Sequence, residues 1–270
     1  MLIRRSHVAA AGFATLIAGI LYYLCNHFLD GSCWIGMQLS QTVAKHEYCE
    51  FSNMDAFFRQ SMNSYSNLAY FFLGMILILT GISDHRGKNK KNVITQFPAL
   101  SVLFGSCLVY LCFGSTFFHA SLTWPGQRFD MNGTYSITII LVLLSLYRLL
   151  HQAEREDQLK KITVISFFVL LLFFVYLHRV IKSTFLLPGM MLAVTALTIA
   201  NYIQNKNFQL PFAITALVCL VVAFIFRQLD AAKIACDPDS LWQGHAAWHV
   251  LTGLSSFLLY LFYRSENTSV

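Results

Sequence analysis

The chain has 270 residues, of which 56% are hydrophobic and 12% are charged, and its mean hydropathy is +0.57. A soluble domain carries roughly 25% charged residues, so the composition excludes that class and indicates an integral membrane protein. The apolar runs lack the alternation of barrel strands, so the spans should be helices that satisfy their own backbone hydrogen bonds. The net charge of +6 is mostly explained by membrane topology, and we find no case for nucleic-acid binding.

Eight segments approach the length of about 20 predominantly apolar residues that a spanning helix needs. They are 8–28, 64–82, 97–120, 131–150, 162–180, 184–203, 210–229 and 244–263. The boundary between the fifth and sixth is the shortest, since His178, Arg179, Lys182 and Ser183 alone interrupt that apolar run. The first segment follows MLIRR as a signal peptide would, but it is long and no A-x-A site follows it, so we expect an uncleaved anchor.

Lysine and arginine set the expected orientation. With the N-terminus inside, twelve of the 19 Lys and Arg residues fall on the inner side and seven on the outer side. The clearest inner block is HRGKNKK at 85–91. We therefore predict a multi-pass protein with both termini inside.

The unusual ionisable groups all fall at the outer ends of spans in this topology, and such groups are expected to be functional. They are His119, Asp130, Arg227, Asp230, His245 and His249. Two of them have a simpler interpretation, because Arg227 and Asp230 are three residues apart, which favours an intrahelical ion pair over contact with a lipid headgroup. The others predict a site towards the non-cytoplasmic face.

The histidines form the clearest pattern. In HAAWH, His245 and His249 stand four residues apart and face the same way on one helix. Such a pair can chelate one ion, and His119 can add a third nitrogen from another helix. Three protein ligands with an open position are typical of catalytic zinc, but histidine also binds iron, copper and nickel, and the spacing selects none of them. The competing interpretation is a chance pair that hydrogen-bonds at a helix interface.

Two more polar residues have both a structural and a functional interpretation. Ser115 lies one turn before His119 and either bonds the carbonyl one turn back or donates a hydrogen bond beside the metal. Asp130 either caps the fourth span or binds the metal's water. The residues 124–126 are predicted to form the turn that precedes it.

Motifs in a fixed order resemble the alkaline ceramidases, and more broadly the seven-helix membrane hydrolases that include adiponectin-receptor-like proteins. They are NSYSNLAYFFLG (63–74), GSTFFHASLTWPGQRFDM (114–131), FRQLDAAKIAC (226–236) and GHAAWHVLTGLSSF (244–257). The likeness spans about 47–263. It implies an all-α membrane protein with a seven-helix hydrolase core and one extra N-terminal transmembrane helix. The predicted division is an anchor at 1–30, an outer loop at 31–62, a catalytic domain at 63–264 and a tail at 265–270.

The resemblance implies a zinc site of His119, His245 and His249, with Ser115 and Asp130 as catalytic residues beside the bound water. The implied reaction is hydrolysis of the N-acyl bond of ceramide, or of a related lipid of the bilayer, to a fatty acid and a long-chain amine. Asp130 would accept and return the proton, and Ser115 would donate to the oxyanion. The alternatives are a zinc-containing receptor or sensor and an ester-cleaving phospholipid hydrolase of the same superfamily. No oligomeric state is predicted.

Three cysteines lie outside the membrane in this topology, where a disulfide is favoured. Family members join the segment before the first core helix to the last outer loop. Cys49 and Cys236 match those two positions, and Cys33 would then be free.

Some family members also hold calcium in the acidic segment before the first core helix, which corresponds to 46–60. Glu47 and Glu50 are present there, but one residue is missing, and Gln60 stands where a carboxylate would be wanted. Calcium prefers several oxygen ligands with enough negative charge. We therefore expect zinc without calcium, and interpret Glu47, Glu50 and Asp55 as a solvated outer loop.

Overall fold

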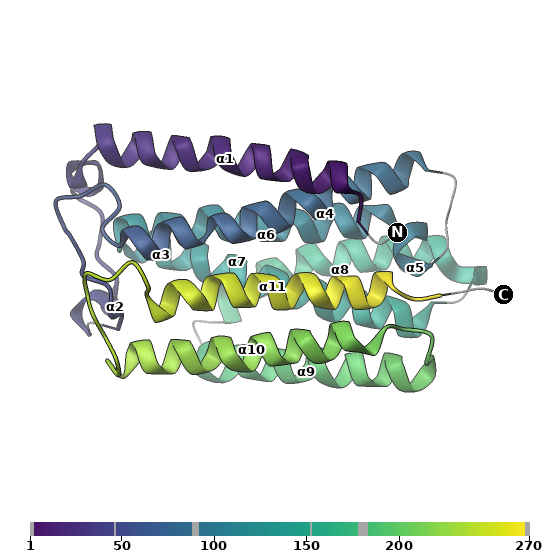
Figure 1. The fold of residues 1–270 in the computed structure, drawn as a ribbon. Helices are drawn as coiled ribbons and strands as arrows, with labels where there is room; N and C mark the ends of the chain where they lie inside the picture. The colour runs from purple at the N-terminus through teal and green to yellow at the C-terminus, as the bar shows by residue number, and fades with distance from the viewer. Residues whose placement is uncertain (1–2, 46, 88–91, 152, 178–182, 268–270) are drawn as a thin grey trace.

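The computed structural model describes residues 3–45, 47–87, 92–151, 153–177 and 183–267, and all its regular elements are helices (Figure 1). Eight helices are long and apolar enough to cross a membrane, which confirms the predicted all-α membrane fold. The long helices are α1 (Arg5–Phe28), α4 (Leu68–Arg86), α6 (Pro98–Ser121), α7 (Trp124–Leu150), α8 (Glu156–Leu177), α9 (Ser183–Gln204), α10 (Leu210–Ala231) and α11 (Gly244–Arg264). The short ones are η1 (Gly31–Trp34), α2 (Gln41–Ala44), α3 (Ser61–Ser66), α5 (Val93–Gln96) and η2 (Ala153–Arg155). The predicted boundary at 178–182 and part of the basic block, 88–91, lie outside the described residues.

Two predicted boundaries differ from the structure. The second span is divided at Asn67, so that α3 precedes α4. The fourth begins at Trp124 rather than at 131, because the hydroxyl of Thr123 accepts from the N–H of Gly126 and caps the helix. Pro125 suits the first turn, where no intrahelical N–H bond is needed. The stretch 124–126 is therefore helix, and the turn before it falls at Leu122, which is left-handed.

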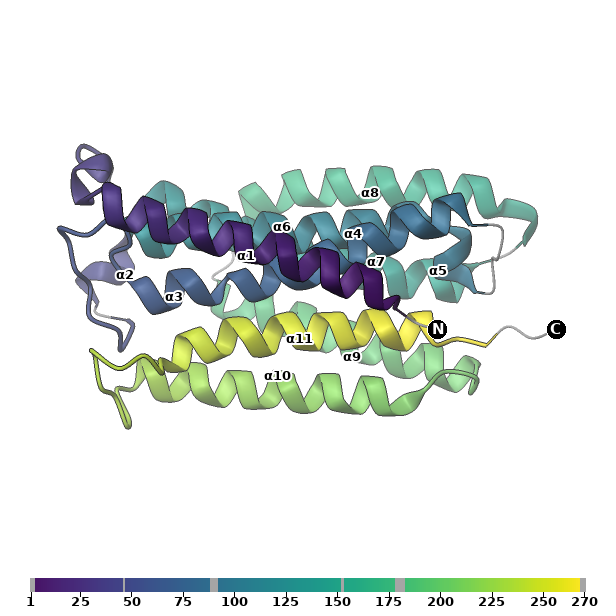
Figure 2. The ribbon, with the colours of Figure 1, turned by 45° about the horizontal axis from the view of Figure 1, so that its top comes forward.

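The helices pack into one elongated bundle (Figures 1 and 2). Helix α1 packs on α4, which packs on α6, and α6 packs on α7. Helices α8 and α9 lie against α7, whereas α10 runs beside α11, and α11 contacts α3 and α4. The extra helix α1 is also fixed by a hydrogen bond of 2.9 Å between the hydroxyls of Tyr22 and Thr116.

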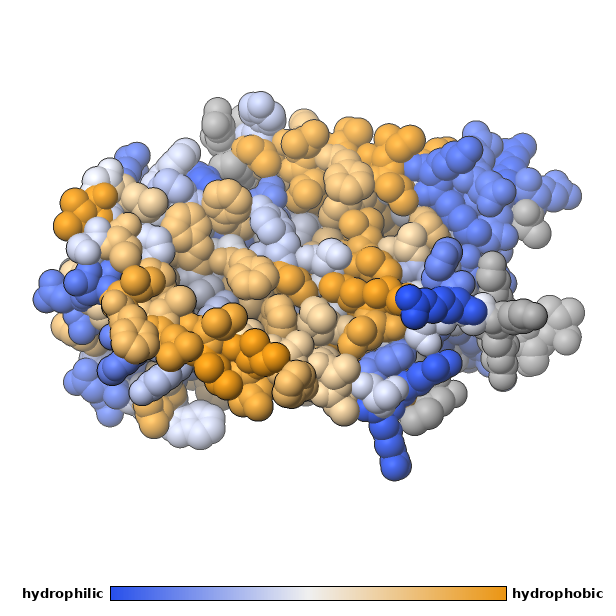
Figure 3. Space-filling view, turned by 90° about the horizontal axis from the view of Figure 1, so that it is seen from above, coloured by the Kyte–Doolittle hydropathy of each residue, from blue (hydrophilic) through white to orange (hydrophobic). Residues whose placement is uncertain are grey.

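The two ends of the bundle differ. Helix α1 begins and α11 ends at one of them, which we call the termini end, and α2 and the start of α11 lie at the other, which we call the loop end (Figure 1). Figure 3 shows hydrophobic side chains across the middle of one face, with hydrophilic ones gathered towards both ends. This banding is what a bilayer around the bundle requires.

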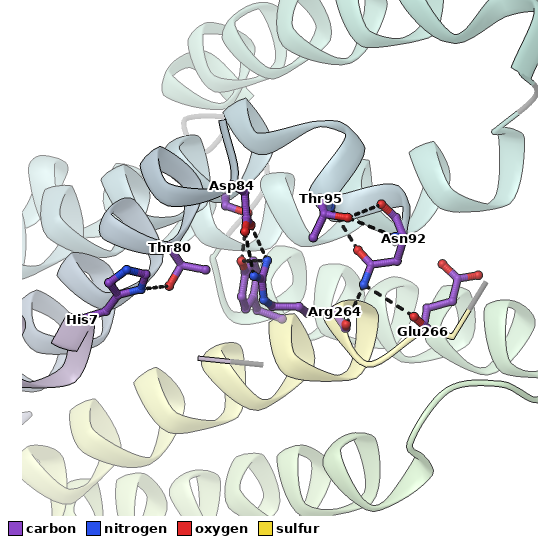
Figure 4. Close-up of polar contacts among 9 residues, drawn as sticks. His7, Thr80, Asp84, Asn92, Thr95, Arg264 and Glu266 are labelled. Carbon is purple, nitrogen blue, oxygen red and sulfur yellow. Dashed lines mark hydrogen bonds and ion pairs between the residues drawn. The ribbon is translucent and has the colours of Figure 1, made fainter. Parts of the chain in front are cut away.

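Polar contacts join several elements at the termini end (Figure 4). Arg264 of α11 donates both terminal nitrogens to the carboxylate of Asp84 in α4, at 2.5 and 2.9 Å. Asn92 donates to the backbone carbonyl of Arg264 at 2.8 Å. His7 of α1 lies 3.1 Å from the hydroxyl of Thr80, which brings the extra helix into the same region. These contacts tie α1, α4 and α11 together at the end of the bundle opposite to His245 and the start of α11.

Candidate metal centre

The first two turns of α11 carry His245 and His249 on one face. Their ring centroids are 4.6 Å apart, and both side chains are buried. The start of the helix is held by Asp230 of α10, whose Oδ2 accepts from the backbone N–H of His245 at 3.1 Å. A carboxylate at a helix N-terminus is electrostatically favourable. The spacing in HAAWH therefore puts both imidazoles on the same side, and Asp230 fixes the start of the helix that carries them.

His119 arrives from α6, near the end of that helix. Its ring centroid is 4.9 Å from that of His245 and 5.2 Å from that of His249. One potential ligand atom from each of the three residues lies within 4.8 Å of the others, and all three residues are buried. Two stretches of chain more than 120 residues apart thus meet at one point.

The free nitrogens of this cluster fit a metal ion. His119 Nε2 and His245 Nδ1 are buried and have no hydrogen-bond partner. An unpaired buried polar group costs free energy unless something binds it. Three neutral imidazoles can supply lone pairs to a divalent cation and leave a coordination position open. The described residues can therefore hold a metal, and its identity belongs to the proposal below.

Ser115 and Asp130 lie on the neighbouring helices α6 and α7, and their side chains interact. Ser115 is one turn before His119, and its buried hydroxyl makes no hydrogen bond to the preceding turn, so that structural alternative does not hold. Asp130 is six residues inside α7, so it does not cap that helix. The two come close because Gly114 lets α7 approach, since a Cβ there would lie 3.3 Å from the backbone nitrogen of Asp130.

Tyr48 covers the histidine cluster from the outer segment. Its ring centroid is 5.1 Å from that of His119 and 4.6 Å from that of His245. The guanidinium of Arg227 lies over the same ring, 5.4 Å from its centroid. The predicted ion pair between Arg227 and Asp230 is wrong, because it does not form among the described residues. The carboxylate of Asp230 instead accepts two backbone N–H groups, those of Cys49 and His245.

A disulfide fixes the segment that carries Tyr48. Cys49 and Cys236 are bonded, with their Cα atoms 5.7 Å apart, and this is the pair that the family resemblance implies. Lys233 adds a second link, because its ammonium donates to the backbone carbonyl of Tyr48. Cys33 is free and exposed. The loop after α10 is therefore tied to the outer segment directly above the histidines.

Three residues of the acidic outer segment already use their oxygens in hydrogen bonds within the protein. Both carboxylate oxygens of Glu50 accept backbone N–H groups at the start of α3, from Met62 at 2.6 Å and from Asn63 at 2.8 Å. The amide oxygen of Gln60 contacts His119, and the carbonyl of Tyr48 accepts from a lysine. These oxygens of Glu50, Gln60 and Tyr48 are thus already hydrogen-bonded, and the carbonyl of Tyr48 meets a cation, which disfavours a calcium ion at them. Glu50 is also buried, so the predicted solvated loop is wrong for this residue.

The sequence did not predict three residues of this site. Tyr48 covers the rings, Gln60 contacts His119 and the hydroxyl of Ser66 contacts His249. Ser66 belongs to the motif NSYSN, so its place in the motif was the available signal. Gln60 was noted only for the carboxylate that it replaces, and nothing local to it points to a histidine 59 residues away.

Comparison with known proteins identifies a family over most of the chain. The family model for ceramidases matches residues 40–268, which include the histidine cluster, Ser115, Asp130 and both cysteines of the disulfide. The search of curated proteins found no match.

Proposed function

This chain belongs to the ceramidase family, whose members are hydrolases acting on the ceramide amide bond, and on that premise we propose that it is a zinc-dependent intramembrane amidase. His119, His245 and His249 hold the zinc. The products are a free fatty acid and a long-chain amine. The observation that carries the proposal is the convergence of three buried imidazoles. It is supported by a buried serine one turn before His119 and by the carboxylate of Asp130 that interacts with this serine.

When bound, the zinc supplies Lewis acidity, which polarises the amide carbonyl and makes a water molecule acidic near neutral pH. Zinc suits the site because three histidine ligands with one open position are typical of catalytic zinc. Other divalent metals also bind imidazole, so metal analysis decides the identity.

Asp130 moves the proton in this mechanism. Its carboxylate accepts a proton from the attacking water as the new C–O bond forms at the carbonyl carbon. It then gives that proton to the amine nitrogen as the C–N bond breaks, so that water is consumed and the amine leaves neutral. Arg227 is close enough to Asp130 to interact with it electrostatically.

Ser115 stabilises the negative charge that develops on the carbonyl oxygen. Its hydroxyl is buried and interacts with the carboxylate of Asp130, so the proton donor and the proton carrier of the proposed reaction are neighbours. Removing one such donor typically raises the barrier by about 2.7–4 kcal/mol. We expect Ser115→Ala to lose about 10²-fold or more in kcat.

An apolar cavity of about 210 Å³ supports a lipid substrate. It lies among α6, α7, α9, α10 and α11, and Trp248 and Thr252, on either side of His249 in sequence, line it. Leu111, Ile137 and Leu217 give it a hydrocarbon surface. We propose that the acyl chain lies here, which would direct the amide towards the histidines.

We also propose that both termini face the cytoplasm and that the site faces the other side. The excess of Lys and Arg on the inner segments supports this orientation, and the start of α1 and the end of α11 at one end of the bundle agree with an even number of spans. The predicted division into anchor, outer loop, catalytic domain and tail stays a prediction. Labelling of single cysteines placed in the loops of intact cells tests the orientation.

The decisive experiment incubates the full chain, purified in detergent, with N-acyl and O-acyl lipids, and identifies released fatty acids by mass spectrometry. We expect about one zinc per chain, cleavage of ceramide, and loss of both in His245→Ala. Asp130→Asn should retain zinc and lose most turnover. Cleavage of esters alone would favour the phospholipid hydrolase. Zinc binding without any cleavage would favour a receptor, and active protein without metal would overturn the mechanism.

A further inference from the structure

Two of the three histidines have their second ring nitrogen hydrogen-bonded to residues at the two ends of the short helix α3. His119 Nδ1 lies 2.7 Å from the side-chain oxygen of Gln60, which immediately precedes α3. His249 Nδ1 lies 2.8 Å from the hydroxyl oxygen of Ser66, the last residue of α3. One short helix therefore contacts ligands from both α6 and α11.

The neighbours of Gln60 determine which way its amide faces. Its Nε2 donates to the hydroxyl of Ser52 at 3.1 Å, and its Oε1 accepts from the side chain of Asn63 at 3.3 Å. An amide oxygen can only accept, so the proton of the shared bond belongs to His119 Nδ1. The lone pair of His119 is then on Nε2, the buried nitrogen without a partner.

The same reasoning applies to Ser66. Its hydroxyl donates to the backbone carbonyl of Asn63 at 2.9 Å, so its oxygen is left to accept from His249 Nδ1–H. His249 therefore also carries its free lone pair on Nε2. His245 has no such contact, since its Nδ1 is buried and unpartnered. Its position depends instead on Asp230, which accepts from its backbone N–H.

Helix α3 is itself held rigidly against α6. The backbone N–H of Gln60 donates to the carbonyl of His119 at 3.1 Å, so the residue that orients the ring also pairs with its main chain. At the start of α3, Glu50 accepts from the N–H groups of Met62 and Asn63. The hydrogen bonds that α3 makes to the Nδ1 atoms are thus held in place, and hydrogen bonds of that kind fix the tautomer and the direction of a metal-ligating imidazole.

We propose that Gln60 and Ser66 are positioning residues that set the metal affinity of the site, by holding His119 and His249 in the tautomer that leaves Nε2 free. The inference rests on the proposed zinc site. Both acceptors are neutral, so they orient the rings without the increase in ligand basicity that a carboxylate gives. A carboxylate at position 60 should preserve the orientation and strengthen the ligand.

The test measures zinc affinity, by competition with a fluorescent zinc chelator, on the full chain in detergent. Gln60→Leu and Ser66→Ala should each bind zinc about 10- to 100-fold more weakly than the unmodified protein. Gln60→Glu keeps an acceptor at Nδ1 and should bind zinc at least as tightly as the unmodified protein. Ser61→Ala is the matched control, because Ser61 is on the same helix and, among the described residues, its hydroxyl bonds only the carbonyl of Phe58.

Each affinity is read beside the unfolding temperature of the same variant. Should Gln60→Leu fail to fold, Gln60→Glu and Ser66→Ala, which alter fewer contacts, carry the test. The inference is overturned if Gln60→Leu and Ser66→Ala bind zinc like Ser61→Ala, or if Gln60→Glu is as weak as Gln60→Leu. In either case, zinc binding and turnover by the unmodified protein would leave the proposed function standing. Absence of zinc from the unmodified protein would remove both.

Discussion

Gly114 controls how closely α7 can approach α6 beside the proposed catalytic pair. A Cβ atom at this position would lie 2.8 Å from the carbonyl oxygen of Phe129 and 3.3 Å from the backbone nitrogen of Asp130. Because these are backbone atoms of a helix, no side-chain rotation can relieve the contact. In Gly114→Ala, α7 must therefore move by about 0.6 Å to restore an ordinary separation.

A shift of this size should affect catalysis more than metal binding. Misplacement of a reacting group by about 1 Å can cost about 10²-fold in rate, so we expect kcat to fall about tenfold as Asp130 moves with α7. None of the three histidines is on α7, so the zinc content should stay near that of the unmodified protein. Overpacking should also lower the free energy of unfolding by about 1–3 kcal/mol.

The assay compares turnover of a fluorescent ceramide, zinc content and the unfolding temperature, all in detergent. Gly12→Ala is the matched control, because a Cβ at that glycine of α1 would meet nothing nearer than 4.0 Å. Our reasoning is refuted if Gly114→Ala keeps the kcat and the stability of Gly12→Ala. That result would mean that the close approach at Gly114 does not determine the position of Asp130.

Three other predictions concern stability. Burial raises the pKa of Glu50 from 4.5 to about 7, so between these values the folded protein keeps a proton that the unfolded chain has released. The free energy of unfolding should therefore fall by about 3 kcal/mol as the pH rises through this window, and Glu50→Gln should flatten the slope in thermal scans. Replacing Cys49 and Cys236 with serine removes a cross-link between residues 187 apart, and denaturant titration should show a loss of about 2–5 kcal/mol. An unchanged midpoint would contradict this. Arg264→Gln leaves the half-buried carboxylate of Asp84 unpaired and should lower the free energy of unfolding by about 3–5 kcal/mol. Adding Asp84→Asn should restore part of this loss, whereas additive losses in the double variant would argue against the pair.

The sequence predicted the membrane fold and the identity of the three histidines. Hydrocarbon surroundings make each span satisfy its own backbone, so eight apolar runs can be read one at a time. The pair in HAAWH is likewise local, because a separation of four residues determines a shared helical face. The alternation of the eight spans placed His119 at the same end as that pair, and the motifs identified the family that the match to residues 40–268 confirms.

Tertiary structure alone decided what surrounds those histidines. Asp230 has an arginine three residues before it, which locally favours an ion pair, yet it accepts two backbone N–H groups from segments that fold against it. Gln60 has no periodicity or charge that could indicate a contact with His119. A neutral side chain can form hydrogen bonds of similar free energy with many partners. Its actual partner therefore depends on which groups the packed helices bring within about 3 Å. Apolar length and histidine spacing are properties of a single segment of the chain. The orientation of an imidazole instead depends on two segments, the one that carries the ring and the one that carries its hydrogen-bond partner.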